Sequence, residues 1–534
     1  MKYNLLALML VLLSMFSTIG YAKEQIAPVR VININNPKYA NALCNNGKAA
    51  TYNFILSKDR GLGEQDYRKK WLVVLSGGGK CIDEASCSAR WKDNPKTQLN
   101  LDGIGSHANM VPALVQSTRN FDGNGILDFD GQKAQRTKRI IGEAENPFRG
   151  SNGKDGFNRV WINYCSSDSW GGLGTSVTVD PVNFPKMAFD KKNAAISSLY
   201  FGGAKIVESV IDLIMKGQIQ TGGLGGKVNP AYIPDAVHGE LVLAGSSAGG
   251  NGTIRNLDAV AHQVKSINPA IKVYGIIDAI STVGTRPDVQ IGKIPVYENG
   301  DGYYESANFY TNAHPEQVMT DYDEATGTVC DNSKTNANGQ LVNYCYATTS
   351  FLLRDEITTP YFVVQQAYDV VIHEGLKFIY TQLFKEYTDA ISQLPGLVLS
   401  GTPSTDPVLL AESYIRNRIT SQAVTIGVKQ NNRAGLFIPN YAKGLHQIMT
   451  DSQRFHSSER HQWNEVGSPN LGVEYVNTTV NLPTVLGNFR SCVLMFSQNK
   501  TAYNNCINTL WSNSPAEAIY DDVRVINTTA INRP

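Results

Sequence analysis

The chain has almost no net charge and, beyond its first residues, no long apolar run. Its 534 residues include 48 Lys and Arg and 47 Asp and Glu, which gives a formal net charge of +1. This balance excludes a general attraction to nucleic acid or to anionic membranes. A membrane-spanning helix needs about 20 apolar residues, and no such run follows the amino terminus, so we expect no integral membrane segment in the mature protein.

Motifs for metals and phosphates are also missing. The sequence has no C-x-x-C pair and no cluster of histidines, so we expect no metal site. The acidic stretch at residues 122–130 lacks the spacing of a calcium loop through to a distal glutamate, and it is interpreted as a solvated turn. No G-x-x-x-x-G-K-[ST] motif is present either, and no cofactor is expected.

The amino terminus has the features of an export signal. A lysine at position 2 precedes an apolar run at residues 5–16, and small residues follow up to Ala22. This pattern predicts a secretory signal peptide at residues 1–22 and a secreted or periplasmic protein. Residues 23–534 contain no repeat and no low-complexity linker, so they are predicted to form a single domain. The polar, turn-rich stretch at about residues 281–358 is interpreted as an insertion.

The number of cysteines is even, and export makes disulfide bonds the expected state of all eight. Sequence alone leaves the connectivity open. Short spacings favour three local pairs and leave one long-range pair: Cys81 with Cys87, Cys330 with Cys345, Cys492 with Cys506, and Cys44 with Cys165.

Apolar, β-branched runs alternate with helical patterns along the chain, which predicts an α/β fold with a mostly parallel sheet and helices on both of its faces. Residues 204–216 show helical spacing. The predicted buried strands are residues 71–75, 160–164, 241–243, 273–277 and 361–365.

A G-x-S-x-G motif follows one of these strands, with Gly245, Ser247 and Gly249 at the fixed positions. Helical spacing resumes at residues 253–264, so the motif lies between a strand and a helix. In a nucleophile elbow the serine sits in a strained turn, and the residues two places before and after it must lack a Cβ. Ser246 fails this test because alanines flank it at those positions. The pattern therefore predicts Ser247 as a nucleophile, against the plainer interpretation of a Gly-rich turn.

A second glycine run, Gly77-Gly78-Gly79, follows an earlier predicted strand. Acyl transfer creates an oxyanion, and backbone N–H groups must already point toward it. In an enzyme with a nucleophile elbow, one donor is the residue after the serine and another comes from a Gly-rich loop. The sequence therefore predicts an oxyanion hole from Ala248 together with Gly78 or Gly79.

Together, these residues resemble the pectin acetylesterase family, which includes Notum. The members of this family are serine carboxylic-ester hydrolases. Four blocks in the family's order support the resemblance: residues 77–90 with the glycine run and two cysteines, residues 164–170 with Tyr-Cys-Ser-Ser-Asp, residues 243–250 with the serine motif, and residues 360–369 ending in an aspartate. The sequence departs from plant-type members at Lys80, where they carry tryptophan. The substrate of the plant members therefore does not transfer directly.

The resemblance implies an α/β-hydrolase-type fold and a triad in the order Ser, Asp, His, which maps to Ser247, Asp369 and His446. Asp278, which ends the strand after the serine motif, is a rival for the acid. Of the other histidines after the serine motif, His456 is the next candidate, and His373 stands too close to Asp369. Sequence does not decide whether Asp168 lines the site or stabilises its loop.

The expected reaction is hydrolysis of an ester substrate, most simply O-deacetylation of an acetylated glycan. Three alternatives stay open. The first is a Notum-like deacylase of longer acyl chains. The second is an acyltransferase that passes the acyl group to an alcohol. The third is a non-catalytic secreted binding protein on the same fold.

Overall fold

The structure is a computed structural model, and it describes only some of the residues of the chain. These are residues 26–57, 66–79, 84–92, 110, 118–121, 125–127, 148, 156–184, 195–225, 228–280, 290–291, 294–295, 357–365, 369, 434–437 and 449.

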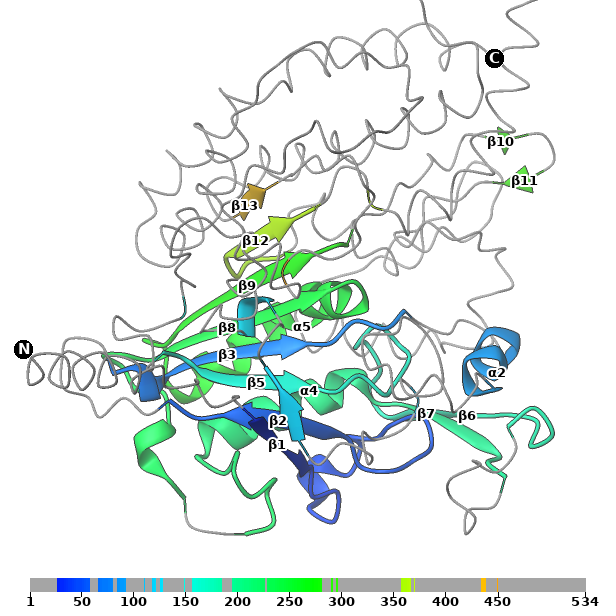
Figure 1. The fold of residues 1–534 in the computed structure, drawn as a ribbon, viewed down its shortest axis with the longest axis horizontal. Coiled ribbons are helices and arrows are strands. Elements are labelled where there is room, and N and C mark those ends of the chain that lie inside the picture. The colour runs from blue at the N-terminus through cyan, green and yellow to red at the C-terminus, as the bar shows by residue number, and fades with distance from the viewer. Residues whose placement is uncertain are drawn as a thin grey trace, which may run out of the picture.

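A nine-stranded sheet with the order β13-β12-β9-β8-β3-β5-β2-β1-β4 forms the centre of the fold (Figure 1). The six strands from β13 to β5 are parallel, whereas β2 is antiparallel to both of its neighbours and β4 is antiparallel to β1. The strands are β1 Ile26–Val31, β2 Thr51–Ile55, β3 Lys70–Leu75, β4 Thr118–Asn120, β5 Asn158–Ile162, β8 Glu240–Ser246, β9 Lys272–Asp278, β12 Tyr361–Val364 and β13 Ala434–Phe437.

The other elements among the described residues are two antiparallel pairs of short strands, three α-helices and four 3₁₀ turns. In Figure 1, α2 and the β6–β7 strand pair lie on the side toward which the arrowheads of the parallel strands point. The bounds are β6 Thr175–Thr178, β7 Ser198–Phe201, β10 Gln290–Ile291, β11 Ile294–Pro295, α2 Glu84–Lys92, α4 Gly203–Met215, α5 Ala248–Ile267, η1 Pro37–Tyr39, η2 Tyr67–Lys69, η5 Gly125–Leu127 and η6 Pro230–Tyr232.

The central strands are buried on both faces, and alternate residues belong to two separate cores. Trp71 and Val73 of β3 pack in one core with α4 and α5. Leu72 and Val74 pack in the other, which includes Met449 and several phenylalanines. Successive side chains of a strand point to opposite faces, so strands buried on both sides become continuous apolar runs. This explains why the runs in the sequence predicted the central strands correctly.

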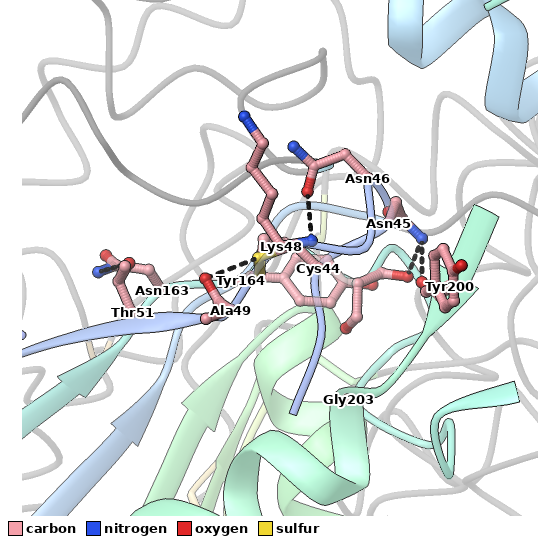
Figure 2. The surroundings of a disulfide bond; sticks show 12 residues. Cys44, Asn45, Asn46, Lys48, Ala49, Thr51, Asn163, Tyr164, Tyr200 and Gly203 are labelled. Carbon is pink, nitrogen blue, oxygen red and sulfur yellow. Dashed lines mark hydrogen bonds between the residues drawn. A yellow bond between two sulfur atoms is a disulfide. The ribbon is translucent and has the colours of Figure 1, made fainter. Parts of the chain in front are cut away.

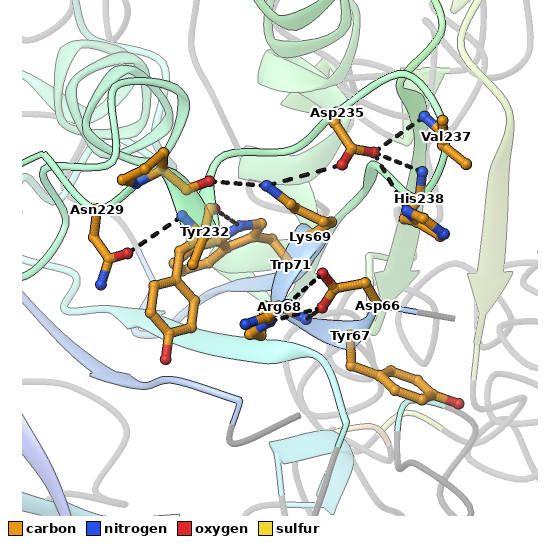
Figure 3. A network of polar contacts seen from close by, with 12 residues as sticks. Asp66, Tyr67, Arg68, Lys69, Trp71, Asn229, Tyr232, Asp235, Val237 and His238 are labelled. Atoms are coloured by element: carbon orange, nitrogen blue, oxygen red, sulfur yellow. Dashed lines mark hydrogen bonds and ion pairs between the residues drawn. The ribbon is translucent and has the colours of Figure 1, made fainter. Parts of the chain in front are cut away.

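A polar network secures the amino end of β3, at the edge opposite the arrowheads (Figure 3). Asp66 forms an ion pair with Arg68 at 2.9 Å, and Lys69 donates to the carbonyl of Pro230 at 2.8 Å. The Trp71 indole donates to the carbonyl of Tyr232 at 2.9 Å. Burial raises the pKa of the Asp66 carboxyl, but the hydrogen bonds and charge of Arg68 outweigh burial and hold it below its ordinary value.

A disulfide bond joins Cys44 to Cys165, which are 121 residues apart in the sequence (Figure 2). It connects the loop before β2 to the loop after β5, and both cysteines are fully buried. The Asn45 amide donates to the carbonyls of Ser166 and Tyr200 at 2.7 and 2.9 Å, which ties the same two loops to β7. The predicted long-range pair is therefore confirmed.

The carboxylate of Asp212 on α4 is buried and contacts three polar side chains. It accepts from Lys38 and from the Tyr39 hydroxyl at 2.6 Å each, and Lys216 lies 2.8 Å away. Burial raises the pKa of the Asp212 carboxyl, but hydrogen bonds from Lys216, Lys38 and Tyr39 lower it by more than burial raises it. The net pKa is therefore below its ordinary value of 3.8. The folded state thus binds this proton more weakly than the unfolded chain does. The stabilisation is present above the unfolded pKa and is lost as the pH falls through the folded one.

We therefore expect Asp212→Asn to lower the free energy of unfolding by about 1–3 kcal/mol at pH 7. The difference between variant and wild type should shrink as the pH falls below about 4, where the unfolded carboxyl becomes protonated. Urea denaturation of both proteins at pH 7 and pH 3.5 measures this. An equal difference at both pH values would contradict the assignment of the effect to the charge.

The mostly parallel sheet and the five predicted strands are confirmed, with α4 within one residue of its predicted bounds. Both α4 and α5 cover the same face. Several predicted features lie outside the described residues: the signal peptide, most of the insertion at 281–358, and the cysteines Cys81, Cys330, Cys345, Cys492 and Cys506. Cys87 is described, and it is disulfide-bonded. Among the helices that the structure describes, none has the length and hydropathy to span a bilayer.

Candidate active site

Ser247 stands alone between strand β8, which ends at Ser246, and helix α5, which begins at Ala248. Its backbone has φ 57° and ψ −125°, a region that residues with a side chain rarely occupy. The conformation is held on both sides, because the Ser247 N–H donates to the carbonyl of Asp278 at 2.9 Å and the Ser247 carbonyl accepts from Asn251 at 3.0 Å. The sharp strand-to-helix turn leaves Ser247 partly exposed while its neighbours are buried.

The two motif glycines are required by close backbone packing. A Cβ on Gly245 would lie 2.1 Å from the carbonyl oxygen of Gly249, and a Cβ on Gly249 would lie 2.1 Å from that of Leu75. Real Cβ contacts are never this short, so any larger residue would open the turn. Ser246, the neighbouring serine, is buried and donates its hydroxyl to Asp278 at 2.7 Å. The steric reason predicted for the motif is therefore present in the structure.

The glycine run lies next to this turn because β3 and β8 are parallel neighbours, with Leu75 opposite Gly245. The first turn of α5 touches the end of β3, so the loop that follows β3 starts beside Ser247. Gly78 and Gly79 both have positive φ, 154° and 67°. The N–H of Ala248 opens α5, where the helix dipole favours negative charge. The start of α5 and the loop after β3 thus lie at the same edge of the sheet.

The Tyr164–Trp170 block is a rigid support for this edge. Ser167, Ser169 and Trp170 all have positive φ, and the fully buried Trp170 indole donates to the carbonyl of Ser76 at 3.1 Å. Burial and the nearby Asp168 carboxylate raise the pKa of the Tyr164 phenol, whose oxygen accepts from the Ser169 N–H at 2.7 Å. This block holds Ser76, the residue just before the glycine run.

The carboxylate of Asp168 is only 2% exposed and is occupied by four donors. They are the Ser166 hydroxyl at 2.6 Å and the backbone N–H groups of Trp170, Gly172 and Gly203 at 2.9, 3.1 and 2.8 Å. A carboxylate that ties its own loop to the start of α4 is structural. The structure thus decides the question that sequence left open, and Asp168 stabilises the loop.

Two buried polar residues of α5 belong to the same support and were not singled out from the sequence. Arg255 donates to the carbonyl of Asp168 at 2.9 Å, and Asn256 donates to that of Trp170 at 2.9 Å. Both side chains are less than 10% exposed, at 6% and 3%. Their signal in the sequence is a pair of polar residues at positions of the helix that otherwise carry apolar side chains.

Asp369 and Asp278 are both fully buried, but they have different surroundings. Asp369 follows β12 by five residues, and its carboxylate lies 3.5 Å from the Gln365 amide. Asp278 ends β9 and accepts from the Ser246 hydroxyl at 2.7 Å and the Met449 N–H at 2.9 Å. Asp278 therefore links the serine turn to the chain near Met449, whereas Asp369 lies after the strand that borders β13.

The histidines considered for the triad, His373, His446 and His456, lie outside the described residues, as does Lys80. The strand before His446 is described: β13 ends at Phe437, nine residues earlier, and pairs with β12 in parallel. Val364 of β12 is opposite both Asp278 and Phe437, so the carboxyl ends of β9, β12 and β13 lie level. In the described part of the chain, no group of three or more His, Cys, Asp or Glu residues could hold a metal ion.

A family model described as pectinacetylesterase matches residues 155–466, which is more than half of the chain. The chain belongs to the pectinacetylesterase family. Among curated relatives of this chain, palmitoleoyl-protein carboxylesterase NOTUM of Homo sapiens is 29% identical over 238 residues, and that of Drosophila melanogaster is 32% identical over 237 residues. The matches cover 44% of this chain in both cases.

The chain spans a third or less of the length of these relatives, 33% of the human protein and 26% of the Drosophila protein. Among solved structures, the Wnt deacylase Notum from Drosophila is 21% identical, with a TM-score of 0.44, over 80% of this chain and 87% of that one.

Proposed function

We propose that the protein is an exported serine esterase that hydrolyses carboxylic esters. The observation that carries this proposal is the strained turn at Ser247, which lies beside the glycine loop after β3. Membership of the pectinacetylesterase family and relatives named as carboxylesterases support the same reaction class. The buried disulfide bond and the signal-like amino terminus support action in an oxidising compartment outside the cytosol.

The proposed triad is Ser247, His446 and Asp369. His446 takes the proton of the Ser247 hydroxyl while the Ser247 oxygen attacks the ester carbonyl, and Asp369 orients the imidazole of His446. The negative charge that develops on the carbonyl oxygen is received by the N–H groups of Ala248 and of Gly78 or Gly79. The ester C–O bond then breaks and the leaving alkoxide takes the proton from His446. Water attacks the acyl-enzyme by the same route and releases the carboxylic acid.

The order of the strands supports this choice of acid and base. Nucleophile, acid and base follow β8, β12 and β13, whose carboxyl ends lie at one edge of the sheet. Loops at that edge are where α/β sheets place their active sites. Asp278, the rival acid, is already occupied by Ser246 and Met449, which supports Asp369 in the triad.

The proposed substrate is an O-acetylated glycan, and no cofactor takes part in the reaction. A second candidate is a deacylase of longer acyl chains, which the palmitoleoyl-protein carboxylesterases among the relatives favour. The two differ in the volume of the acyl pocket that each needs.

Hydrolysis of p-nitrophenyl esters from acetate to octanoate tests both candidates. An acetylesterase is expected to act best on acetate, with kcat/KM falling as the chain lengthens. A maximum at octanoate would favour the longer-chain deacylase. A folded protein that hydrolyses none of these esters, and whose serine does not react with a fluorophosphonate, would contradict the proposed function and favour a binding protein.

A further inference from the structure

Arg90 of α2 reaches the glycine run from outside the sheet. Its Nη2 donates to the carbonyl of Gly78 at 2.8 Å and to the Ser167 hydroxyl at 3.3 Å. Its Nη1 lies 3.2 Å from the place that a Cβ on Gly79 would occupy. The guanidinium therefore lies directly against the Gly78–Gly79 segment, and no role in the sequence patterns accounts for it.

We propose that Arg90 is a positioning residue that aims the Gly79 N–H at the oxyanion. The carbonyl of Gly78 and the N–H of Gly79 belong to one peptide unit, which is planar and trans. In a trans peptide these two groups point in opposite directions. A donor that holds the Gly78 carbonyl on one side thus fixes the Gly79 N–H on the other. This inference rests on the proposed function, because it assigns the orientation of an oxyanion donor.

The loop needs such an anchor because glycine flanks the peptide on both sides. Gly78 and Gly79 have φ of 154° and 67°, and residues without a Cβ pass between positive and negative φ at little cost. The Gly78–Gly79 peptide could therefore rotate and turn its N–H away from the site. An oxyanion donor contributes most when it is already in place, since no reorganisation is then needed during the reaction.

Arg90 is itself held by two separate parts of the fold. Ser167 belongs to the loop that Asp168 ties to α4. On the other side, Trp91 packs edge-on against Phe184 at 5.7 Å, which fixes α2 beside residues 181–184. The hydroxyl of Ser88 adds a hydrogen bond to the same loop at 3.2 Å. The guanidinium thus has a fixed position from which to hold the peptide.

The chemistry of the guanidinium suits this task better than that of an ammonium. A cationic donor polarises the amide that it contacts, which makes the N–H at its other end a stronger donor. The planar fork of Arg90 can touch Gly78, Ser167 and the face of Gly79 together, whereas lysine would supply a single point of charge. Lysine at this position should therefore restore only part of the effect.

Kinetics of Arg90→Met and Arg90→Lys on p-nitrophenyl acetate test the proposal, with Arg68→Met as the matched control. Arg68 holds the opposite end of β3 through its ion pair with Asp66. We expect Arg90→Met to lower kcat about 10- to 100-fold with KM within about twofold, since loss of one oxyanion donor costs at most about 1000-fold. The kcat of Arg90→Lys should lie between those of the wild type and Arg90→Met, and Arg68→Met should keep the wild-type kcat.

A boronic acid inhibitor separates positioning from general damage to the fold. Phenylboronic acid forms a tetrahedral adduct with the serine hydroxyl, and one of its oxygens mimics the oxyanion. Its Ki should rise by about the same factor as kcat falls. Each kcat is calculated per active site, with the active-site concentration taken from complete labelling of Ser247 by a fluorophosphonate. Added guanidinium should raise kcat of Arg90→Met but not of Arg68→Met.

Two outcomes would overturn the proposal. An active wild type with unchanged kcat and unchanged Ki in both Arg90 variants would overturn this inference and leave the proposed function standing. A wild type that is inert to esters and to fluorophosphonate would overturn the proposed function and this inference with it. If Arg90→Met does not fold, Arg90→Lys, which keeps the charge and most of the volume, decides on the same readouts.

Discussion

Replacing Ser247 with alanine is expected to lower kcat on p-nitrophenyl acetate by a factor of about 10⁴ or more while the protein stays folded. The hydroxyl is the proposed nucleophile, and only its oxygen is lost. The strained backbone gains no new clash, because serine already carries a Cβ at φ 57°. Steady-state kinetics together with the thermal midpoint of unfolding measure the two effects separately.

Ser246→Ala is the matched control for this prediction, because it removes the same atom one residue earlier. The Ser246 hydroxyl donates to the buried Asp278 at 2.7 Å, so its loss should lower stability by about 1–3 kcal/mol. At least a tenth of the activity should remain. Retained turnover in Ser247→Ala, or a collapse of turnover in Ser246→Ala alone, would show that the nucleophile is wrongly assigned.

The second large effect is expected for Asp369→Asn, which should lower kcat by a factor of about 10⁴ because the amide cannot hold the imidazole in the required tautomer. Asparagine has almost the same shape, so the fully buried site should keep its packing. The measurement is kcat across pH 5 to 9, with folding followed by circular dichroism.

Asp278→Asn provides the comparison, since both carboxylates are buried at the same edge of the sheet. The Asp278 carboxylate accepts from the Ser246 hydroxyl and the Met449 N–H. An asparagine oxygen can still accept from these donors, so we expect a lower thermal midpoint and a loss in kcat of less than about 100-fold. The reverse ranking of the two variants would make Asp278 the acid of the triad.

The central part of the fold could be predicted from the sequence because its strands are buried on both faces. Strands β3, β5, β8, β9 and β12 appear as apolar runs, and each overlaps its predicted range, with β5 shifted by two residues toward the amino terminus. The edge strands were harder to find. Val29 and Arg30 of β1 are not buried, and β2 includes the buried polar Asn53, so neither forms a continuous apolar run. Their antiparallel pairing depends on contacts between distant segments.

The candidate site divides in a similar way. The turn at Ser247 could be predicted because the glycines that it requires stand only two residues on each side of the serine, although the carbonyl that a Cβ on Gly249 would meet belongs to Leu75 of β3. The role of Asp168 could not, because three of its four donors are backbone N–H groups whose direction depends on the loop and on the start of α4. The same holds for Arg90, whose partners Gly78 and Ser167 are 12 and 77 residues away.

By itself, then, the sequence determined the strand, turn and helix around Ser247 and the buried strands, because these follow from the spacing of residues near the motif and from apolar runs. The sequence favoured the pairing of Cys44 with Cys165 but left the connectivity open, and the structure confirmed that pair. Only the tertiary structure decided that Asp168 is structural, that Asp278 is occupied by Ser246 and Met449, and that Arg90 faces the glycine loop. Such roles depend on which donors and acceptors meet when distant segments pack together. The residue types alone do not contain that information.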